Sequence, residues 1–130
     1  DEGIDLDEAG AGGLHVSLNK VVAVDNLDEA IKLDEEDAGD IIAKLKHVTV
    51  EASGDDGIQI TELGEGKVQA VLNHVTSNDN VKYGIKIEQF LSEDEDEAVE
   101  PEGSIKLIKL ELNNNGKGGG EPKLTNIIVK

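Results

Sequence analysis

An internal repeat of 27 residues is the feature that most constrains how this chain can fold. The repeat shows first in four related tetrapeptides: Gly3-Ile4-Asp5-Leu6, Ala30-Ile31-Lys32-Leu33, Gly57-Ile58-Gln59-Ile60 and Gly84-Ile85-Lys86-Ile87. Further apolar columns keep the same spacing: Leu14, Ile41 and Val68; Val16, Ala43 and Ala70; Leu18, Leu45 and Leu72; Val21, Val48 and Val75. A period of this length indicates a repeat architecture, in which each unit buries its apolar face against its neighbours.

Within each repeat the apolar residues alternate with polar ones, which is the pattern of a strand with one buried face. The first repeat shows this alternation in Leu14-His15-Val16-Ser17-Leu18. Glycine-rich or acidic stretches separate the alternating segments, and such stretches are typical of turns. We therefore predict three short strands per coil, which in the first coil are Ile4–Leu6, Leu14–Leu18 and a strand that starts at Val21. A long turn joins the first two strands, and a tight corner at Asn19-Lys20 joins the second to the third.

This pattern resembles the right-handed parallel β-helix proteins, the pectate-lyase-like solenoids. The resemblance covers roughly residues 3–91 and rests on the period. Proteins of this architecture often place Asn at the tight corner, where its short polar side chain tolerates the left-handed conformation. Asn19 and Asn73 match that pattern, and Lys46 departs from it. The expected fold is one all-β domain over residues 1–130, a right-handed parallel β-helix of about four coils.

A leucine-rich repeat is the competing interpretation, because a period of 27 residues lies within the range of that family. Leu72-x-x-Val75-x-Ser77-x-x-Asn80 echoes its consensus. The echo fails two residues after the Asn, where this chain has Asp28, Asp55 and Lys82 in place of an apolar residue. It also leaves the alternating strand at Leu14–Leu18 unexplained.

The fourth repeat is irregular. We predict regular coils at 3–29, 30–56 and 57–83, then an irregular coil with an acidic loop over 84–120, and a capping strand within 121–130. The acidic loop, 92–104, is expected to be solvated because its adjacent like charges repel. A glycine-rich segment from Asn113 to Gly120 is expected to be flexible. An uncapped coil exposes unpaired backbone, so we also predict an end-to-end homodimer if the C-terminal strand does not seal the last coil.

Composition excludes several partners. The 29 acidic residues face 12 lysines and no arginine, which gives a net charge of −17. Nucleic acid and anionic membranes are therefore not expected as partners, because both require clustered cations. The absence of cysteine excludes disulfides and thiolate metal sites. No signal peptide or apolar segment long enough to span a membrane is visible, so we expect a soluble chain, extracellular if natural.

Three pairs or columns of side chains are candidate sites. Glu8, Glu35 and Glu62 share one repeat position, and stacked carboxylates could bind Ca²⁺; the alternative is a solvated acidic edge. His47 and His74 share the corner position but lack the third ligand of a transition-metal site. Leu63 and Phe90 are expected to pack against the 92–104 loop or to form a small association patch.

The resemblance implies carbohydrate cleavage, but the residues do not favour it. Pectate-lyase-like chemistry usually employs an arginine base, which this chain lacks, and aromatic residues for sugar stacking are limited to Tyr83 and Phe90. We therefore expect a structural repeat scaffold without catalytic activity or cofactor, engineered or designed. The first alternative is an extracellular module that binds Ca²⁺ or a glycan, and the second is a polysaccharide-degrading enzyme.

Overall fold

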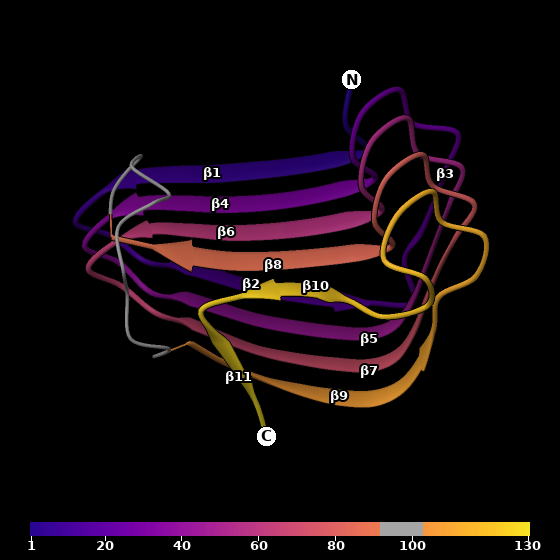
Figure 1. The fold of residues 1–130 in the computed structure, drawn as a ribbon. Helices are drawn as coiled ribbons and strands as arrows, with labels where there is room; N and C mark the ends of the chain where they lie inside the picture. Colours follow the sequence, from indigo (N-terminus) through magenta and orange to yellow (C-terminus); the bar gives the residue numbers. More distant parts are fainter. Residues whose placement is uncertain (92–102) are drawn as a thin grey trace.

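The computed structural model describes residues 1–91 and 103–130, and every regular element in these ranges is a β-strand. Successive strands alternate between two walls of a stack that runs from the N-terminal to the C-terminal end, except that the second and third strands lie in the same wall (Figure 1). The first wall contains β1 (Ile4–Gly10), β4 (Ile31–Asp37), β6 (Ile58–Gly64), β8 (Ile85–Phe90) and β10 (Lys123–Thr125). The second contains β2 (Leu14–Asn19), β3 (Val22–Val24), β5 (Ile41–Glu51), β7 (Val68–Asn78), β9 (Gly103–Glu111) and β11 (Ile127–Val129).

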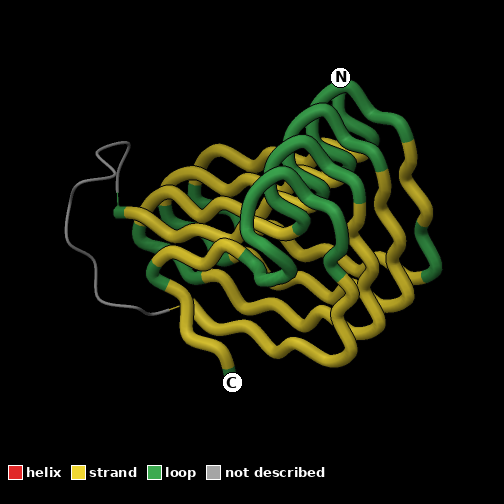
Figure 2. The backbone as a smooth tube through the Cα atoms, turned by 45° about the vertical axis from the view of Figure 1, so that its right-hand side comes forward, coloured by secondary structure: helices red, strands yellow, loops and turns green. Residues whose placement is uncertain are grey.

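Every strand pair in the two sheets is parallel, and the pairing follows the sequence period. Ile31 lies opposite Ile4 on one side and Ile58 on the other, and Ala43 lies between Val16 and Ala70 in the same way. Each residue is thus stacked on the residue 27 positions away. The prediction of an all-β parallel solenoid of about four coils is confirmed, and Figure 2 shows the coils stacked one behind another.

The corner between the second and third segments is tighter than predicted. In the second and third coils these segments form single strands, β5 and β7, that bend at His47 and His74. These two residues and Lys20 have φ angles of 53° to 57°, in the left-handed region. The bend changes the phase of the alternation, so Leu45 and Val48 both point inward. The expectation that Asn19 or Asn73 takes the left-handed conformation is wrong, because the residue after each Asn takes it.

The leucine-rich interpretation is not supported by the structure. The segment that it left unexplained, Leu14–Leu18, forms most of strand β2 and pairs with β5. The segments from Leu18, Leu45 and Leu72 that echoed its consensus belong to the second sheet and its corners.

Thin layers of branched aliphatic side chains fill the space between the sheets. Nineteen buried hydrophobic residues form one cluster, and its largest members are Ile31, Leu33, Ile41, Leu45, Ile58, Ile60, Leu72, Ile85, Ile87 and Ile105. Each coil contributes one such layer, and each layer lies against the equivalent side chains of the next coil. This arrangement explains why the chain builds a core with almost no aromatic residues.

The fourth coil keeps the stacking but departs from the period. Ala70 lies opposite Ile105, an offset of 35 residues in place of 27, and the extra residues fall between β8 and β9. Most of the predicted 92–104 loop lies outside the described residues. The segment predicted to be flexible is instead tied to the coil above, because the N–H of Asn113 donates to Asn78 Oδ1 at 2.8 Å and the Asn115 side chain bonds to Asn80. The residues after it add one more rung, since β10 pairs with β8 and β11 with β9.

We predict that Leu72→Ala lowers the free energy of unfolding by about 2–5 kcal/mol, because Leu72 is fully buried and the substitution leaves a cavity. Urea denaturation followed by circular dichroism measures the change. Leu27→Ala is the matched control: Leu27 is 79% exposed, and its loss should cost less than about 0.5 kcal/mol. Equal costs for the two substitutions would contradict the placement of Leu72 in the core.

Candidate functional site

The Glu8, Glu35 and Glu62 column points into the solenoid. Strands β4 and β6 alternate inward and outward, so Glu35 follows Leu33 on the inner face and Glu62 follows Ile60. Both glutamates have no exposed surface, and Gln89 continues the column at 3% exposure. The expectation of a solvated acidic edge is therefore wrong. The alternation was visible in the sequence and could have located these side chains.

Each glutamate carboxylate lies against the glycine four residues after it in the sequence. The N–H of Gly39 donates to Glu35 Oε1 at 3.1 Å. A Cβ at Gly39 would lie 1.5 Å from the carbonyl oxygen of Gly12 and 2.5 Å from Glu35 Oε1. One at Gly66 would lie 1.6 Å from the carbonyl oxygen of Gly39 and 2.9 Å from Glu62 Oε1, so the stacked turns leave no room for a larger residue. Gln89 has a related role, because its Oε1 accepts a hydrogen bond of 3.0 Å from the N–H of Val68. Glu35 thus folds back towards the turn that follows its strand, whereas Gln89 bonds to the start of β7.

The buried carboxylates have few hydrogen-bond donors. Both oxygens of Glu62 and Oε2 of Glu35 lack a hydrogen-bond partner among the described residues. Burial raises the pKa of Glu62 to about 8, and the neighbouring Glu35 contributes to the rise. Burial also raises the pKa of Glu35. Neighbouring carboxyls one strand spacing apart in a dry interior are not all ionised, so protons are retained in the column at neutral pH.

Calcium binding at the glutamate column stays a prediction, and the geometry does not favour it. Ca²⁺ takes six to eight oxygen ligands, whereas the column is a line of single carboxylates in successive rungs. Three acidic side chains do bring ligand atoms within 4.8 Å of one another elsewhere in the described chain, and they are Glu29, Asp55 and Asp56. Sequence analysis missed this cluster, although two of its residues are adjacent and the third lies 27 positions before Asp56.

Lysine side chains already form ion pairs with two carboxylates of that cluster. Lys82 Nζ lies 2.7 Å from Asp55 Oδ2, and Lys86 Nζ lies 3.9 Å from Asp56 Oδ2. Asp56 is 1% exposed, and its Oδ1 accepts the N–H of Tyr83 at 2.9 Å. Burial raises the pKa of Asp56, which the Tyr83 N–H and Lys86 partly offset. The arrangement is an ion-pair network that joins two rungs.

Asparagine side chains bond along the stack at a different corner from the one where Asn19 and Asn73 lie. This ladder runs through Ser53, Asn80 and Asn115, one residue in each of three coils. Asn26 holds the same repeat position in the first coil, but its Nδ2 has no hydrogen-bond partner among the described residues. Asn80 Oδ1 accepts the N–H of Ser53 at 3.0 Å, and its Nδ2 donates to Asn115 Oδ1 at 2.8 Å and to Ser77 Oγ at 3.0 Å. Asn80 is 2% exposed, so these bonds satisfy a buried amide. The ladder links coils through side chains where the backbone turns.

The two histidines lie together on the surface. The rings of His47 and His74 have their centroids 4.8 Å apart, and the rings are tilted by 43°. Desolvation and the nearby Lys109 lower the pKa of His74. Among the described residues no third ligand completes a metal site with this pair. The two imidazole rings lie one above the other at the corner, as their shared repeat position predicts.

Leu63 and Phe90 are neighbours on β6 and β8. Phe90 is buried at 6% exposure, and Leu63 is half-buried. The partner predicted for them is the 92–104 loop, most of which lies outside the described residues. Their contact with that loop therefore stays a prediction.

Comparison with protein-family models, with curated proteins and with solved structures finds no match for this chain. Within the described ranges no helix is long and apolar enough to cross a membrane.

We predict that Glu62→Gln stabilises the protein at high pH and has little effect at low pH. The folded pKa of Glu62, about 8, is above the ordinary value of 4.5, so the stability that its protonated form contributes is complete below pH 4.5 and is lost as pH rises through 8. Glutamine reproduces the neutral form at every pH. Urea denaturation at pH 5 and pH 9 should therefore show the variant more stable by about 2–4 kcal/mol at pH 9 only.

The matched control for this prediction is Glu65→Gln, which removes the same charge from an exposed side chain. It should change the free energy of unfolding by less than about 0.5 kcal/mol at either pH. A Glu62→Gln effect that is equal at both pH values would show that Glu62 does not titrate in this range.

Proposed function

We propose that this chain is a structural repeat scaffold without catalytic activity. The observation that carries the proposal is the use of its buried polar side chains. Glu35 and Gln89 bind the backbone of their own turn or of the adjoining strand, and Asn80 joins three coils. These groups maintain the stack and point away from solvent, where a substrate would bind. The proposal applies equally to a natural chain and to an engineered one.

The outer face of the first sheet supports the same proposal. Its acidic side chains surround Lys32, whose Nζ lies 3.1 Å from Asp34 Oδ2 and 3.8 Å from oxygens of Asp5 and Asp7. Glycosidases place two carboxyls on either side of a bond with one of them able to hold a proton. Here the carboxylates share one cation, and the pKa of Lys32 is raised by its hydrogen bond to Asp34. This arrangement pairs the carboxylates with a cation and does not favour polysaccharide cleavage.

The alternative function, an acidic module that binds Ca²⁺ or a glycan, makes a different prediction about heat stability. For a scaffold, millimolar CaCl₂ and MgCl₂ at equal ionic strength should raise the thermal midpoint equally, because both only screen the net charge of −17. Differential scanning calorimetry measures the midpoint. A larger rise with calcium, removed by chelator, would instead indicate a specific site and would overturn the scaffold proposal in its simplest form.

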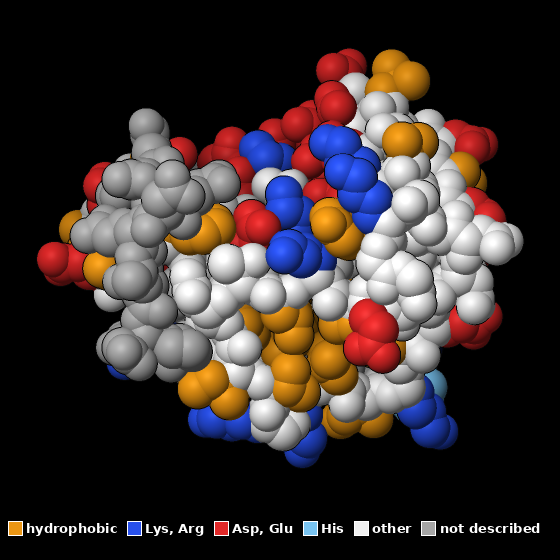
Figure 3. Space-filling model, in the orientation of Figure 1, with side chains coloured by type: hydrophobic (Ala, Val, Ile, Leu, Met, Phe, Trp, Pro, Cys, Tyr) orange, Lys and Arg blue, Asp and Glu red, His pale blue; other side chains and the backbone are white. Residues whose placement is uncertain are grey.

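The two ends of the stack favour end-to-end association. The interior is incompletely covered at both: Leu6 is 37% exposed at one end, and Leu107, Leu110 and Leu124 are only partly buried at the other. Figure 3 shows apolar side chains at the surface in the region of β9 and β10. Residues 1–29 carry eight acids and one lysine, whereas residues 103–130 carry five lysines and two acids. A second copy stacked head to tail would bring these opposite charges together and continue the parallel strands.

We predict that the mass measured by sedimentation equilibrium increases with protein concentration at low salt. Leu6→Asp should abolish the increase, because it places a charge on the apolar end. Val22→Asp is the control, since Val22 is 70% exposed on the side of the same coil. A monomer at all concentrations, or equal effects of the two substitutions, would contradict head-to-tail association.

A further inference from the structure

The outer face of the second sheet differs in charge from the rest of the molecule. Its straight segments, residues 14–19, 41–46, 68–73, 103–108 and 127–130, contain no aspartate or glutamate. They contain Lys44, Lys46, Lys106 and Lys130. In a chain where acids outnumber lysines by 29 to 12, this is a segregated cationic face.

The lysines of this face are also unneutralised. Elsewhere Lys32, Lys82 and Lys86 each form ion pairs with aspartate. Lys44 and Lys106, by contrast, form no ion pair with any described residue, and both are exposed. A cationic surface without internal partners on an acidic protein is complementary to an anionic ligand.

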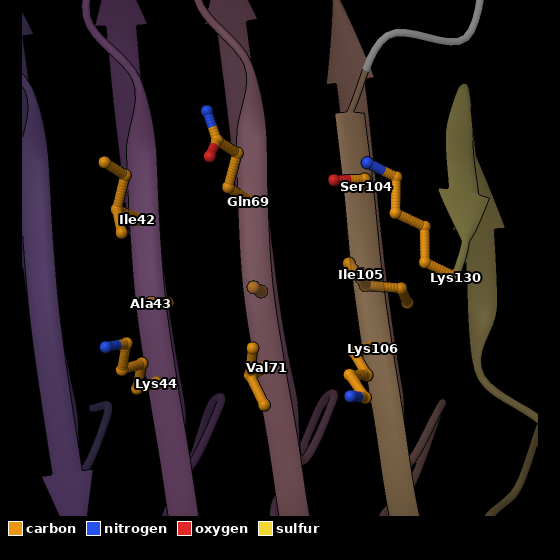
Figure 4. Close-up of a pocket in the computed structure, with 10 residues that line it drawn as sticks. Ile42, Ala43, Lys44, Gln69, Val71, Ser104, Ile105, Lys106 and Lys130 are labelled. Carbon is orange, nitrogen blue, oxygen red and sulfur yellow. The ribbon is translucent and has the colours of Figure 1, made fainter.

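A shallow hollow of about 290 Å³ lies between these lysines. Figure 4 shows Val71 on β7 between Lys44 on β5 and Lys106 on β9, with Ile42 beside Gln69 in the next row. Val71 and Ile42 are half-buried and form an apolar floor. Lys130 extends along the sheet towards Ser104 at the far side of the hollow. The hollow is small compared with ordinary ligand pockets, so it suits a short segment of a longer partner.

The spacing of the cations selects the shape of the ligand. Lys44 and Lys106 are two rungs apart, which is about 9.6 Å at the usual separation of neighbouring strands. A peptide in the polyproline II conformation advances about 3.1 Å per residue with three residues per turn, so residues i and i+3 lie on one side about 9.3 Å apart. Carboxylates at these positions would reach both lysines, and the peptide backbone between them would pass over Val71.

We propose that this hollow binds an extended acidic peptide segment of a partner protein, with carboxylates at every third residue. The aliphatic floor favours a peptide over a polysaccharide, because the hollow has no aromatic side chain for sugar stacking. The absence of arginine disfavours a ligand that requires bidentate contacts to phosphate. The binding is separate from the scaffold role.

Fluorescence anisotropy with a labelled peptide of repeated Glu-Val-Pro triplets tests this proposal on the whole chain. We expect saturable binding that weakens as salt increases. Lys44→Glu with Lys106→Glu should weaken the binding at least about tenfold. The matched control, Lys20→Glu with Lys117→Glu, makes the same change of net charge on exposed lysines elsewhere and should change affinity less than about twofold.

Several outcomes would overturn the proposal. They are an absence of saturable binding, an equal loss in the two double variants, equal affinity for a peptide whose glutamates are gathered in one block, and equal affinity for an oligogalacturonate. The last result would assign the face to carboxylated polymers in general. Circular dichroism first checks that each variant folds, and Lys44→Gln with Lys106→Gln replaces the charge reversal if it does not.

Discussion

The structure depends on the in-register stacking of parallel strands. Each residue lies about one strand spacing, or 4.8 Å, from the residue one period away, so any property of a side chain is repeated directly above and below it. This stacking stabilises columns of apolar side chains, because each side chain packs against similar side chains in the coils on either side, as Ile31 does between Ile4 and Ile58. Amide columns gain as well, because Asn80 can donate along the stack while it accepts from it. Charged columns are the difficult case.

The glutamate column shows how the stack accommodates that difficulty. Three inward carboxylates in register would repel one another strongly if all were ionised in a dry interior. The glycine that follows each glutamate lets the backbone N–H approach one oxygen, as in the bond from Gly39 to Glu35. The raised pKa of Glu62 keeps a proton where no donor is available. The next member of the column is neutral Gln89, so the repulsion is not extended further.

The period made most of the fold predictable, and the failures have separate physical causes. Strand pairing could be predicted because the register of a parallel solenoid is the sequence period itself. The sequence did not lead us to predict the burial of Glu35 and Glu62, because acidic residues next to turns are usually exposed to solvent. The alternation of inward and outward residues after Leu33 and Ile60 nevertheless placed both side chains inside. The left-handed residue at His47 was misplaced by one position, since the spacing from Leu45 to Val48 requires a phase change but does not say which residue makes it.

Other features depend on contacts that the period does not encode. The Asn80 ladder includes a serine, so its positions do not stand out as a column of asparagines. The cationic hollow results from the outward row of Lys44, Val71 and Lys106, whose common surface appears only when the offset of 35 residues between β7 and β9 is known. That offset depends on how the chain re-enters the sheet after β8, which the sequence left open.

The most direct test of the account is the register itself, measured by nuclear Overhauser contacts between backbone protons of neighbouring strands. The account predicts contacts between Ala43 and Ala70, one period apart, and between Ala70 and Ile105, at the longer offset of 35 residues. A pattern of contacts that places Ala70 opposite residues other than Ala43 and Ile105, or antiparallel patterns between these strands, would contradict it.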